Sequence, residues 1–333
     1  MKLSKNDDIK LNIDSLTSEG SGIGRFDGFA VFVRGVVPGD EVVAHIIKCS
    51  KNYAIGVVKD IIKPSKFRIE SDCPVSSKCG GCSFRNVSYD EELRYKKGRV
   101  QDALERIGKL DIEVEEIIGA DKRSHYRNKA QYPVSICDGE LFAGFYAYKS
   151  HRIICNDDCA LQPKEFKSGL EAFRIWAQKA NVTSYDENTG KGLLRHIYFR
   201  KGFATGDIMA CAVINGTSIP ESDLLVSLLR EKLQGLKSVV ININREKSNV
   251  ILGKESKTVW GDDYISDKLL GKTFVISPNS FDQVKTADGE NFNKGMDGVY
   301  PIVAGAVEGE RKKRLLEHIK NPKIGRASCR ERV

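Results

Sequence analysis

Cys73-Pro-Val-Ser-Ser-Lys-Cys79-Gly-Gly-Cys82 places three thiols within ten residues, and only glycines separate the last two. Thiolates on such a flexible segment can turn toward one centre, which suits an iron–sulfur cluster or a zinc ion. A fourth ligand is needed to close the site, and the sequence offers Cys155 and Cys159. The alternative is a redox Cys-x-x-Cys pair, but no thioredoxin-type strand precedes this pair. The spacing therefore favours a bound metal centre.

The composition describes a globular protein of two or three domains. The chain has 333 residues, of which 41% are hydrophobic and 29% are charged. No apolar run approaches the ~20 residues of a membrane span, and the first residues do not resemble a signal peptide. Nine cysteines without a secretory leader indicate a reducing compartment. A cytoplasmic protein without membrane contact is therefore expected.

The net charge of +8 is concentrated at the C-terminus. Residues 311–333 carry nine Lys or Arg and two Glu, a net charge of +7 that leaves about +1 for residues 1–310. A basic tail binds phosphate without identifying a substrate. Any inference of RNA binding must therefore rest on the folded part of the chain.

Residues 1–64 are expected to form a small β-barrel of the OB type. Turns such as Gly20-Ser-Gly22-Ile-Gly24 and Pro38-Gly39-Asp40 separate short apolar segments. The glycine cluster looks like a dinucleotide loop, but no helix follows it, so a barrel turn is favoured. Several short strands in so few residues are typical of such a barrel. The expected strands are Ile9–Ile13, Ala30–Val33, Glu41–Ile47 and Tyr53–Ile61.

Residues 65–275 are expected to form a central α+β domain that carries the cysteine site. Acidic residues in a first turn and apolar residues recurring at helical spacing predict a helix over Ser88–Ile107. Further helices are predicted around Phe166–Ala177 and over Glu221–Leu233. The expected strands are His125–Ile136, Leu141–Tyr148, His151–Cys155, Leu193–Arg200, Ile208–Ile214, Ser238–Asn244 and Asn249–Leu252.

Residues 276–333 show no convincing alternation of strands and helices. A doubly wound nucleotide-binding domain needs on the order of 100–150 residues, more than this stretch provides. The last ten residues, from Ile324 to Val333, look unlike the end of a domain. We therefore expect a truncated third domain followed by a basic tail that is not the native continuation.

These features together resemble the RNA uridine-C5 methyltransferases that carry a TRAM domain and a 4Fe–4S cluster, closest to the bacterial 23S rRNA (uracil-5-)-methyltransferases. The run Gly22–Val33 with Val37–Asp40 is similar to a TRAM domain. The cysteine run and His125–Gln131 are similar to the family's cluster segment and central motif. The further matching stretches are Ala143–Tyr146, Asp158–Gln162 and Gly192–Ile197.

This resemblance implies a ligand set, a cofactor and a partner. Carried over residue by residue, the cluster ligands are Cys73, Cys79, Cys82 and Cys159, and Cys155 is a structural neighbour. The barrel and the central domain would hold RNA, with 23S rRNA as the expected substrate of a monomeric enzyme. S-adenosylmethionine would supply the methyl group.

The family's chemistry begins with addition of a cysteine thiolate to uracil carbon 6, which makes carbon 5 nucleophilic. Carbon 5 takes the methyl group, a general base removes its proton, and the thiolate leaves. The target uridine must leave its stack to react.

This sequence departs from the family where the methyltransferase domain, a Rossmann-like fold, should begin. Ser277–Val284 resembles the entry motif of that domain, but Asp282 and Lys285 stand where the family has Phe and Asn. Gln283 is the one contact to S-adenosylmethionine that the resemblance to the family implies for this chain. No Asp-x-Tyr-Cys-Gly-x-Gly loop follows, and no cysteine follows an Asp-Pro-Pro-Arg motif. The nucleophile and the base are therefore expected to be absent, and with them methyl transfer by this chain.

Several alternatives stay open. One alternative is a non-catalytic RNA-binding module with a structural iron–sulfur or zinc centre, and another is an electron carrier. Neither Cys211, in an apolar strand, nor Cys329, in the basic tail, is a credible nucleophile. Arg127, Lys129, Arg195 and His196 are candidate contacts to RNA phosphates, although each alone is more often a solvated strand residue. Phe26, Phe29 and Phe32 of the barrel are candidates for stacking bases, but strand alternation implies that at least part of this set fills the core.

Overall fold

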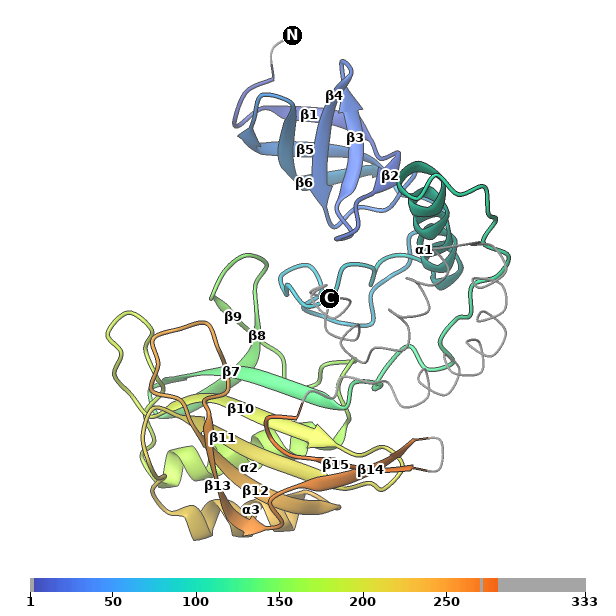
Figure 1. The fold of residues 1–333 in the computed structure, drawn as a ribbon. Coiled ribbons are helices and arrows are strands. Elements are labelled where there is room, and N and C mark those ends of the chain that lie inside the picture. Colours follow the sequence, from blue (N-terminus) through green and yellow to red (C-terminus); the bar gives the residue numbers. More distant parts are fainter. Residues whose placement is uncertain (1–2, 270–271, 281–333) are drawn as a thin grey trace. The chain divides into compact units, whose positions relative to one another are not determined.

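The computed structural model describes residues 3–269 and 272–280, and its chain forms two compact units (Figure 1). The first unit extends to Gly119, and the second begins at Ala120. Within the described residues, no helix combines the length and the apolar character that a membrane span requires. Gln283, Cys329 and the rest of residues 281–333 lie outside the described part of the chain.

A six-stranded sheet in the first unit curls into a small barrel. Its strand order is β1-β5-β6-β4-β3-β2, with β4 and β6 parallel and the other neighbours antiparallel. The ends meet where the Asp14 N–H donates to the Ile23 carbonyl at 2.8 Å. This order, with its one parallel pair, is typical of OB folds. The strands are β1 (Asp8–Asn12), β2 (Ser15–Leu16), β3 (Gly22–Phe26), β4 (Phe29–Arg34), β5 (Glu41–Cys49) and β6 (Tyr53–Lys63).

Alternation of side chains builds the barrel core. Along β4, Val31 and Val33 are fully buried, while their neighbours point outward. Gly24 faces inward where β1 crosses β3, and a Cβ there would lie 2.4 Å from the Asn12 carbonyl oxygen. Only glycine therefore permits this close approach of the two strands.

Residues 65–119 belong to the same compact unit as the barrel. This stretch contains α1 (Tyr89–Asp102) and the π-helical turn η1 (Ala103–Ile107). The Tyr95 hydroxyl donates to the Leu16 carbonyl at 2.6 Å and so ties α1 to the barrel. The sequence instead predicts that residues 65–119 belong to the central domain of residues 65–275. The division into domains at residues 1–64, 65–275 and 276–333 stays a prediction. The expected apolar helix face is solvent-exposed, because Val100 is 52% and Ile107 is 84% exposed.

The second unit contains a seven-stranded mixed sheet of order β13-β12-β11-β10-β7-β8-β9. The core between this sheet and α2 (Glu165–Lys179) and α3 (Ser222–Lys232) includes the fully buried Phe166, Phe173 and Trp176. Both helices lie on the same side of the sheet (Figure 1). The strands are β7 (Lys129–Cys137), β8 (Glu140–Tyr146), β9 (Ile153–Cys155), β10 (Leu194–Lys201), β11 (Ile208–Ile214), β12 (Leu236–Ile243) and β13 (Glu255–Gly261).

A hairpin of β14 (Ile265–Leu269) and β15 (Lys272–Ile276) packs on a second apolar cluster. Ile265 and Ile276 contribute to this cluster together with Tyr198, Met209 and Cys211 of the sheet. The β10 residues alternate between the two clusters, because Phe199 belongs to the helix side and Tyr198 to the hairpin side.

Two strand predictions were wrong in position. Residues 249–252 form a loop rather than a strand, and β13 begins only at Glu255. The Asn244 side-chain amide donates to the carbonyls of Val250 and Ile251, which holds this loop in an irregular conformation. Residues 125–128 precede β7 instead of extending it, since His125 and Arg127 donate their N–H groups to the segment 160–161.

Candidate functional site

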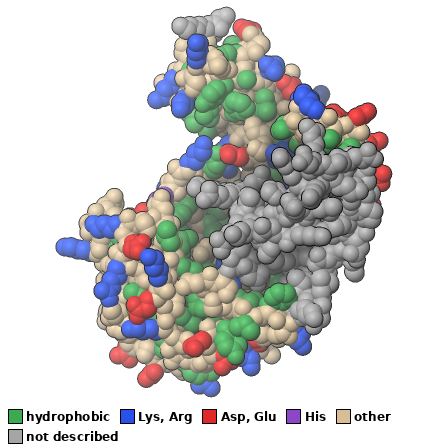
Figure 2. Space-filling model, viewed as in Figure 1, with side chains coloured by type: hydrophobic (Ala, Val, Ile, Leu, Met, Phe, Trp, Pro, Cys, Tyr) green, Lys and Arg blue, Asp and Glu red, His purple; other side chains and the backbone are tan. Residues whose placement is uncertain are grey.

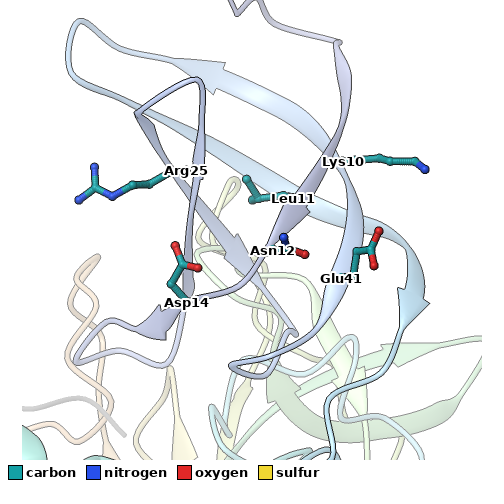
Figure 3. A pocket seen from close by; sticks show the side chains of 6 residues that line it. All are labelled: Lys10, Leu11, Asn12, Asp14, Arg25 and Glu41. Carbon is teal, nitrogen blue, oxygen red and sulfur yellow. The ribbon is translucent and has the colours of Figure 1, made fainter.

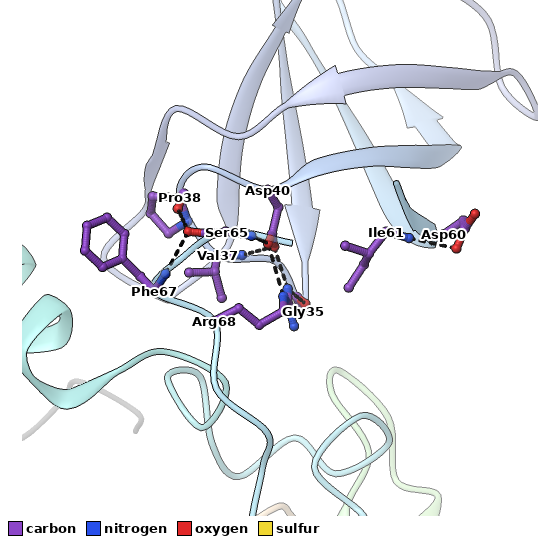
Figure 4. Close-up of polar contacts among 9 residues, drawn as sticks. All are labelled: Gly35, Val37, Pro38, Asp40, Asp60, Ile61, Ser65, Phe67 and Arg68. Atoms are coloured by element: carbon purple, nitrogen blue, oxygen red, sulfur yellow. Dashed lines mark hydrogen bonds and ion pairs between the residues drawn. The ribbon is translucent and has the colours of Figure 1, made fainter. Parts of the chain in front are cut away.

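A buried ion pair fixes the segment that leads from the barrel to the cysteines (Figure 4). The Asp40 carboxylate is fully buried and accepts hydrogen bonds from the Val37 N–H at 2.6 Å, the Ser65 N–H at 2.8 Å and the Arg68 guanidinium. Arg68 also donates to the Gly35 carbonyl at 3.0 Å. Burial alone would raise the pKa of Asp40, but these donors outweigh it and hold that pKa below its usual value. The sequence identified a turn here but gave no signal of its Arg68 partner.

The three cysteines of the first unit lie in the loop between β6 and α1. A compact turn holds them, in which Cys73 accepts from the Ser76 N–H at 3.1 Å and Cys79 donates its N–H to the Val75 carbonyl at 2.8 Å. The Gly81 N–H donates to the Cys79 sulfur at 3.4 Å. Cys73, Cys79 and Cys82 are all half-buried. Backbone N–H groups directed at sulfur stabilise a thiolate, which is the form that binds iron or zinc.

The fourth expected ligand, Cys159, lies in the second unit between β9 and α2. Its carbonyl accepts from the Gln162 N–H at 2.9 Å. Tyr132 is fully buried, and the charge of Cys159 contributes, after burial, to raising its pKa. Within the described residues, the Tyr132 hydroxyl and the Gln162 Oε1 have no hydrogen-bond partner. A buried unpaired donor beside Cys159 fits a site where a sulfur-ligated group would accept that hydrogen bond.

The described residues do not form a metal site from the four expected cysteine ligands. Among residues 3–269 and 272–280, no three Cys, His, Asp or Glu side chains group to hold a metal ion. Cys73, Cys79 and Cys82 belong to the first unit, while Cys155 and Cys159 belong to the second. The donor chemistry still fits iron–sulfur or zinc, because all four expected ligands are soft sulfur donors.

Cys211 is unsuited to nucleophilic catalysis. Its side chain is fully buried in β11, and burial raises the pKa of the thiol to about 12. A thiol with this pKa is almost entirely protonated at neutral pH, and only the thiolate attacks carbon.

The outward face of the barrel carries an aromatic surface over β4 and β6. The rings of Phe32 and Tyr53 meet edge to face, with centroids 5.6 Å apart. Ile55 pairs with Phe32 across the strands, and Val57 is 43% exposed. We call Phe32, Tyr53, Ile55 and Val57 the aromatic face; hydrophobic side chains gather on the barrel in Figure 2. Exposed cations on the barrel strands and loops include Arg25, Lys48 and Lys51.

Exposed rings beside cations suit single-stranded nucleic acid, since bases stack on the rings and the cations bind phosphates. Phe26 and Phe29 pack against the barrel core, so Phe32 is the phenylalanine of the three that joins the aromatic face. Alternation along the strand predicted this division without saying which ring would point outward.

A cavity of about 370 Å³ lies where β1 and β3 approach each other (Figure 3). Side chains of both charge signs line it, and those of Lys10 and Arg25 extend to opposite sides. Mixed charge gives no preference for an anion, so the cavity is a weaker candidate than the aromatic face. The lining residues are Lys10, Leu11, Asn12, Asp14, Arg25 and Glu41.

Arg195 and His196 are buried, contrary to their reading as solvated strand residues. Arg195 donates to the carbonyls of Asn244 at 3.0 Å and Glu246 at 2.8 Å, so its guanidinium serves the fold. Burial, with a contribution from Arg195, lowers the pKa of His196 to about 4. Neither residue therefore offers a free positive charge to RNA phosphates.

Comparison with known proteins supports the nucleic-acid reading of the barrel. Residues 6–59 match the TRAM domain family. The chain is 41% identical over 294 residues to an uncharacterized RNA methyltransferase of Clostridium tetani, covering 88% of this chain and 64% of that protein. A similarly named protein of Halalkalibacterium halodurans is 40% identical over 283 residues, covering 85% of this chain and 62% of that protein. The chain thus spans less than two thirds of the length of these curated relatives.

The fold also has a solved counterpart. The crystal structure of Pyrococcus abyssi tRNA (uracil-54, C5)-methyltransferase in complex with S-adenosyl-L-homocysteine aligns with a TM-score of 0.66 at 22% identity. The alignment covers 90% of this chain and 66% of that chain. At this identity the match shows a shared fold. The chain thus carries a TRAM domain at residues 6–59 and has RNA methyltransferases as its homologues.

Proposed function

We propose that the protein is an S-adenosylmethionine-dependent RNA uridine-C5 methyltransferase of the cytoplasm, acting as a monomer on 23S rRNA. The main support for an RNA substrate is the aromatic face, which lies on a barrel that matches the TRAM family. The homologues and the fold of the Pyrococcus protein support methyl transfer to uracil carbon 5. The choice of 23S rRNA over tRNA rests on the combination of a TRAM domain with the cysteine run.

In this proposal the described residues recognise RNA, and methyl transfer belongs to residues outside them. The reaction needs a thiolate nucleophile and a general base at the flipped uridine. The buried Cys211 cannot serve as the nucleophile, and no described cysteine lies in the motif expected for it. Gln283 is the proposed contact to S-adenosylmethionine, by resemblance alone.

The proposal includes a 4Fe–4S cluster ligated by Cys73, Cys79, Cys82 and Cys159. The sulfur donors, the N–H directed at Cys79 and the unpaired Tyr132 hydroxyl support it. A cluster ligated by distant parts of the sequence would stabilise the fold by constraining the chain. Zinc satisfies the same donors, and absorbance near ~400 nm distinguishes a cluster from zinc.

The test uses the purified chain, methyl-labelled S-adenosylmethionine and transcripts of 23S rRNA and tRNA. Preferential binding of the 23S rRNA transcript supports the proposed RNA substrate. Methyl transfer to a 23S uridine by this chain would support the activity but would contradict the expected absence of the nucleophile and the base from its sequence. RNA binding without methyl transfer supports the second candidate function, a non-catalytic RNA-binding module, which the burial of Cys211 favours for the described residues. Failure to bind either RNA contradicts both functions.

A further inference from the structure

Side-chain contacts join three loops of the second unit. They are residues 147–152 between β8 and β9, 186–192 before β10, and 245–254 between β12 and β13. His151 of the first loop forms an ion pair with Glu187 of the second. The Lys247 side chain of the third lies against Gly190, where a Cβ would be 2.6 Å from its Cε. We call these residues the three-loop surface.

Arg195 and Asn215 hold the third and the second of these loops in place. The Arg195 guanidinium lies over the Tyr185 ring, 4.2 Å from its centroid, while its N–H groups bind loop carbonyls. The Asn215 amide donates to the carbonyls of Gly190 at 3.3 Å and Gly192 at 3.1 Å. The loops therefore keep their shape without a ligand, which lowers the entropic cost of binding one.

One ring on this surface is presented for stacking. His151 stacks on Tyr146 with centroids 5.0 Å apart and an interplanar angle of 17°, and its side chain is 55% exposed. The pair with Glu187 fixes the orientation of the imidazole. Because Tyr146 covers one side of the ring, the opposite side is available to a base, and histidine is among the side chains on which RNA bases stack.

The charge of the surface favours an anion. Two of its acidic groups have internal partners, since Glu187 binds His151 and Asp186 accepts from the Asn188 N–H and the Thr189 hydroxyl. Lys and Arg side chains appear along this side of the second unit in Figure 2. The exposed cations of the three loops are Lys149, Arg152, Lys191, Arg245, Lys247 and Lys254, against the exposed acids Asp186, Glu187 and Glu246.

We propose that the three-loop surface binds a single-stranded segment of the RNA substrate, with one base on the outer side of His151 and phosphates on Lys149, Arg152 and Lys247. This inference rests on the proposed function, because it assigns a second contact site for the same RNA. It adds an RNA site that does not involve the barrel.

The experiment measures fluorescence anisotropy of a labelled 12-nucleotide oligouridylate with the full chain between 50 and 200 mM KCl. The triple variant Lys149→Ala, Arg152→Ala, Lys247→Ala is expected to bind about 10-fold more weakly or worse, with a salt slope smaller by about 2. His151→Ala is expected to lose about 5- to 100-fold in affinity with an unchanged slope, and His151→Phe is expected to retain binding.

A matched control removes three exposed cations elsewhere in the second unit, through Lys164→Ala, Lys179→Ala and Lys237→Ala. Wild-type affinity and slope in the loop variants would overturn the inference and leave the proposed function intact. An equal loss of affinity in the control variant would also overturn it, and so would an oligoaspartate that competes as well as unlabelled oligouridylate. In either case the surface would attract negative charge without recognising RNA. No binding by the wild-type chain would overturn the proposed function itself. Circular dichroism verifies that each variant is folded.

Discussion

The Asp40 carboxylate accepts hydrogen bonds from both Nε and Nη2 of Arg68, residues 28 positions apart in the sequence. This pair joins the turn after β4 to the segment that leads into the cysteines. Asp40 is fully buried, and the Arg68 side chain is 15% exposed. Removing one partner therefore leaves the other poorly paired in a dry environment.

Arg68→Ala should lower the free energy of unfolding of the first unit by roughly 2–3 kcal/mol, below the 3–5 kcal/mol of a fully buried pair because Arg68 is partly exposed. Urea titration followed by hydrogen exchange at Val37 and Ser65, whose N–H groups bind Asp40, measures the change. The exposed Arg25→Ala is the control and should change stability by less than about 0.5 kcal/mol. Equal exchange in both variants would show that the pair contributes nothing.

Acid should destabilise the first unit through Asp40. The folded-state pKa of this carboxyl lies below its unfolded value, so its contribution is present above pH ~4 and disappears as the pH falls through the folded-state pKa. Asp40→Asn should start less stable at pH 7 and show a flatter decline below pH ~4. Unfolding free energies from pH 3 to 7, with the exposed Asp60→Asn as control, measure this. A wild-type decline as flat as that of Asp40→Asn would contradict the assignment.

Removing the aromatic face should weaken RNA binding without changing its salt dependence. Phe32→Ala with Tyr53→Ala deletes two stacking rings and no charge, so affinity for single-stranded RNA should fall about 5-fold or more at a constant slope of affinity against salt. Tyr264→Ala removes a ring that is 49% exposed in the second unit and should leave affinity unchanged. Anisotropy titrations at several salt concentrations distinguish a loss of stacking from a loss of charge. A changed slope of affinity against salt would indicate that the substitutions had disturbed the charged contacts.

Cys79→Ser and Cys159→Ser should each lose iron and the brown chromophore if both residues are cluster ligands. Cys155→Ser is the matched control, since Cys155 is an exposed neighbour only four residues from Cys159. Iron analysis and absorbance near ~400 nm after anaerobic purification measure the result. Iron loss on Cys155→Ser with retention on Cys159→Ser would reverse the ligand assignment.

Tyr132→Phe should affect the metal-free and the iron-loaded chain in opposite directions. Its hydroxyl is buried without a partner among the described residues, so its removal should stabilise the metal-free chain by about 1 kcal/mol. If that hydroxyl donates to a cluster-bound sulfur at Cys159, the same change should destabilise the iron-loaded chain. Thermal unfolding of both forms tests the expectation, and shifts of the same sign would show that the hydroxyl does not contact the cluster.

Local patterns in the sequence predicted β1, β4, β5 and β6 of the barrel and β7 to β12 of the sheet, but they missed β2, β3, β13 and the hairpin of β14 and β15. Strand β11, Ile208–Ile214, has the expected bounds, because an uninterrupted apolar run of this length is typical of a buried strand and is shorter than most buried helices. The segment 249–252 looked equally strand-like but follows Asn244, whose amide binds the loop carbonyls instead. The side-chain hydrogen bonds to backbone groups therefore determine that this segment is a loop, which the periodicity of the sequence does not reveal.

Contacts between residues far apart in the chain could not be predicted from the sequence. Nothing in the residues around Asp40 indicates Arg68, and nothing around His151 indicates Glu187, 36 positions later. The same holds for Arg195, which looks like an exposed RNA contact until three loop residues surround its guanidinium. The cysteine run and the glycine-rich turns could be recognised because their chemistry is local.

The most direct test of the proposed function is mass-spectrometric mapping of 5-methyluridine in the 23S rRNA and tRNA of cells that lack this protein. The account predicts that one 5-methyluridine disappears from 23S rRNA, that the tRNA is unchanged, and that a copy of the intact gene restores the modification. Loss of a tRNA 5-methyluridine with unchanged 23S rRNA would contradict the substrate, and unchanged methylation of both RNAs would contradict the activity.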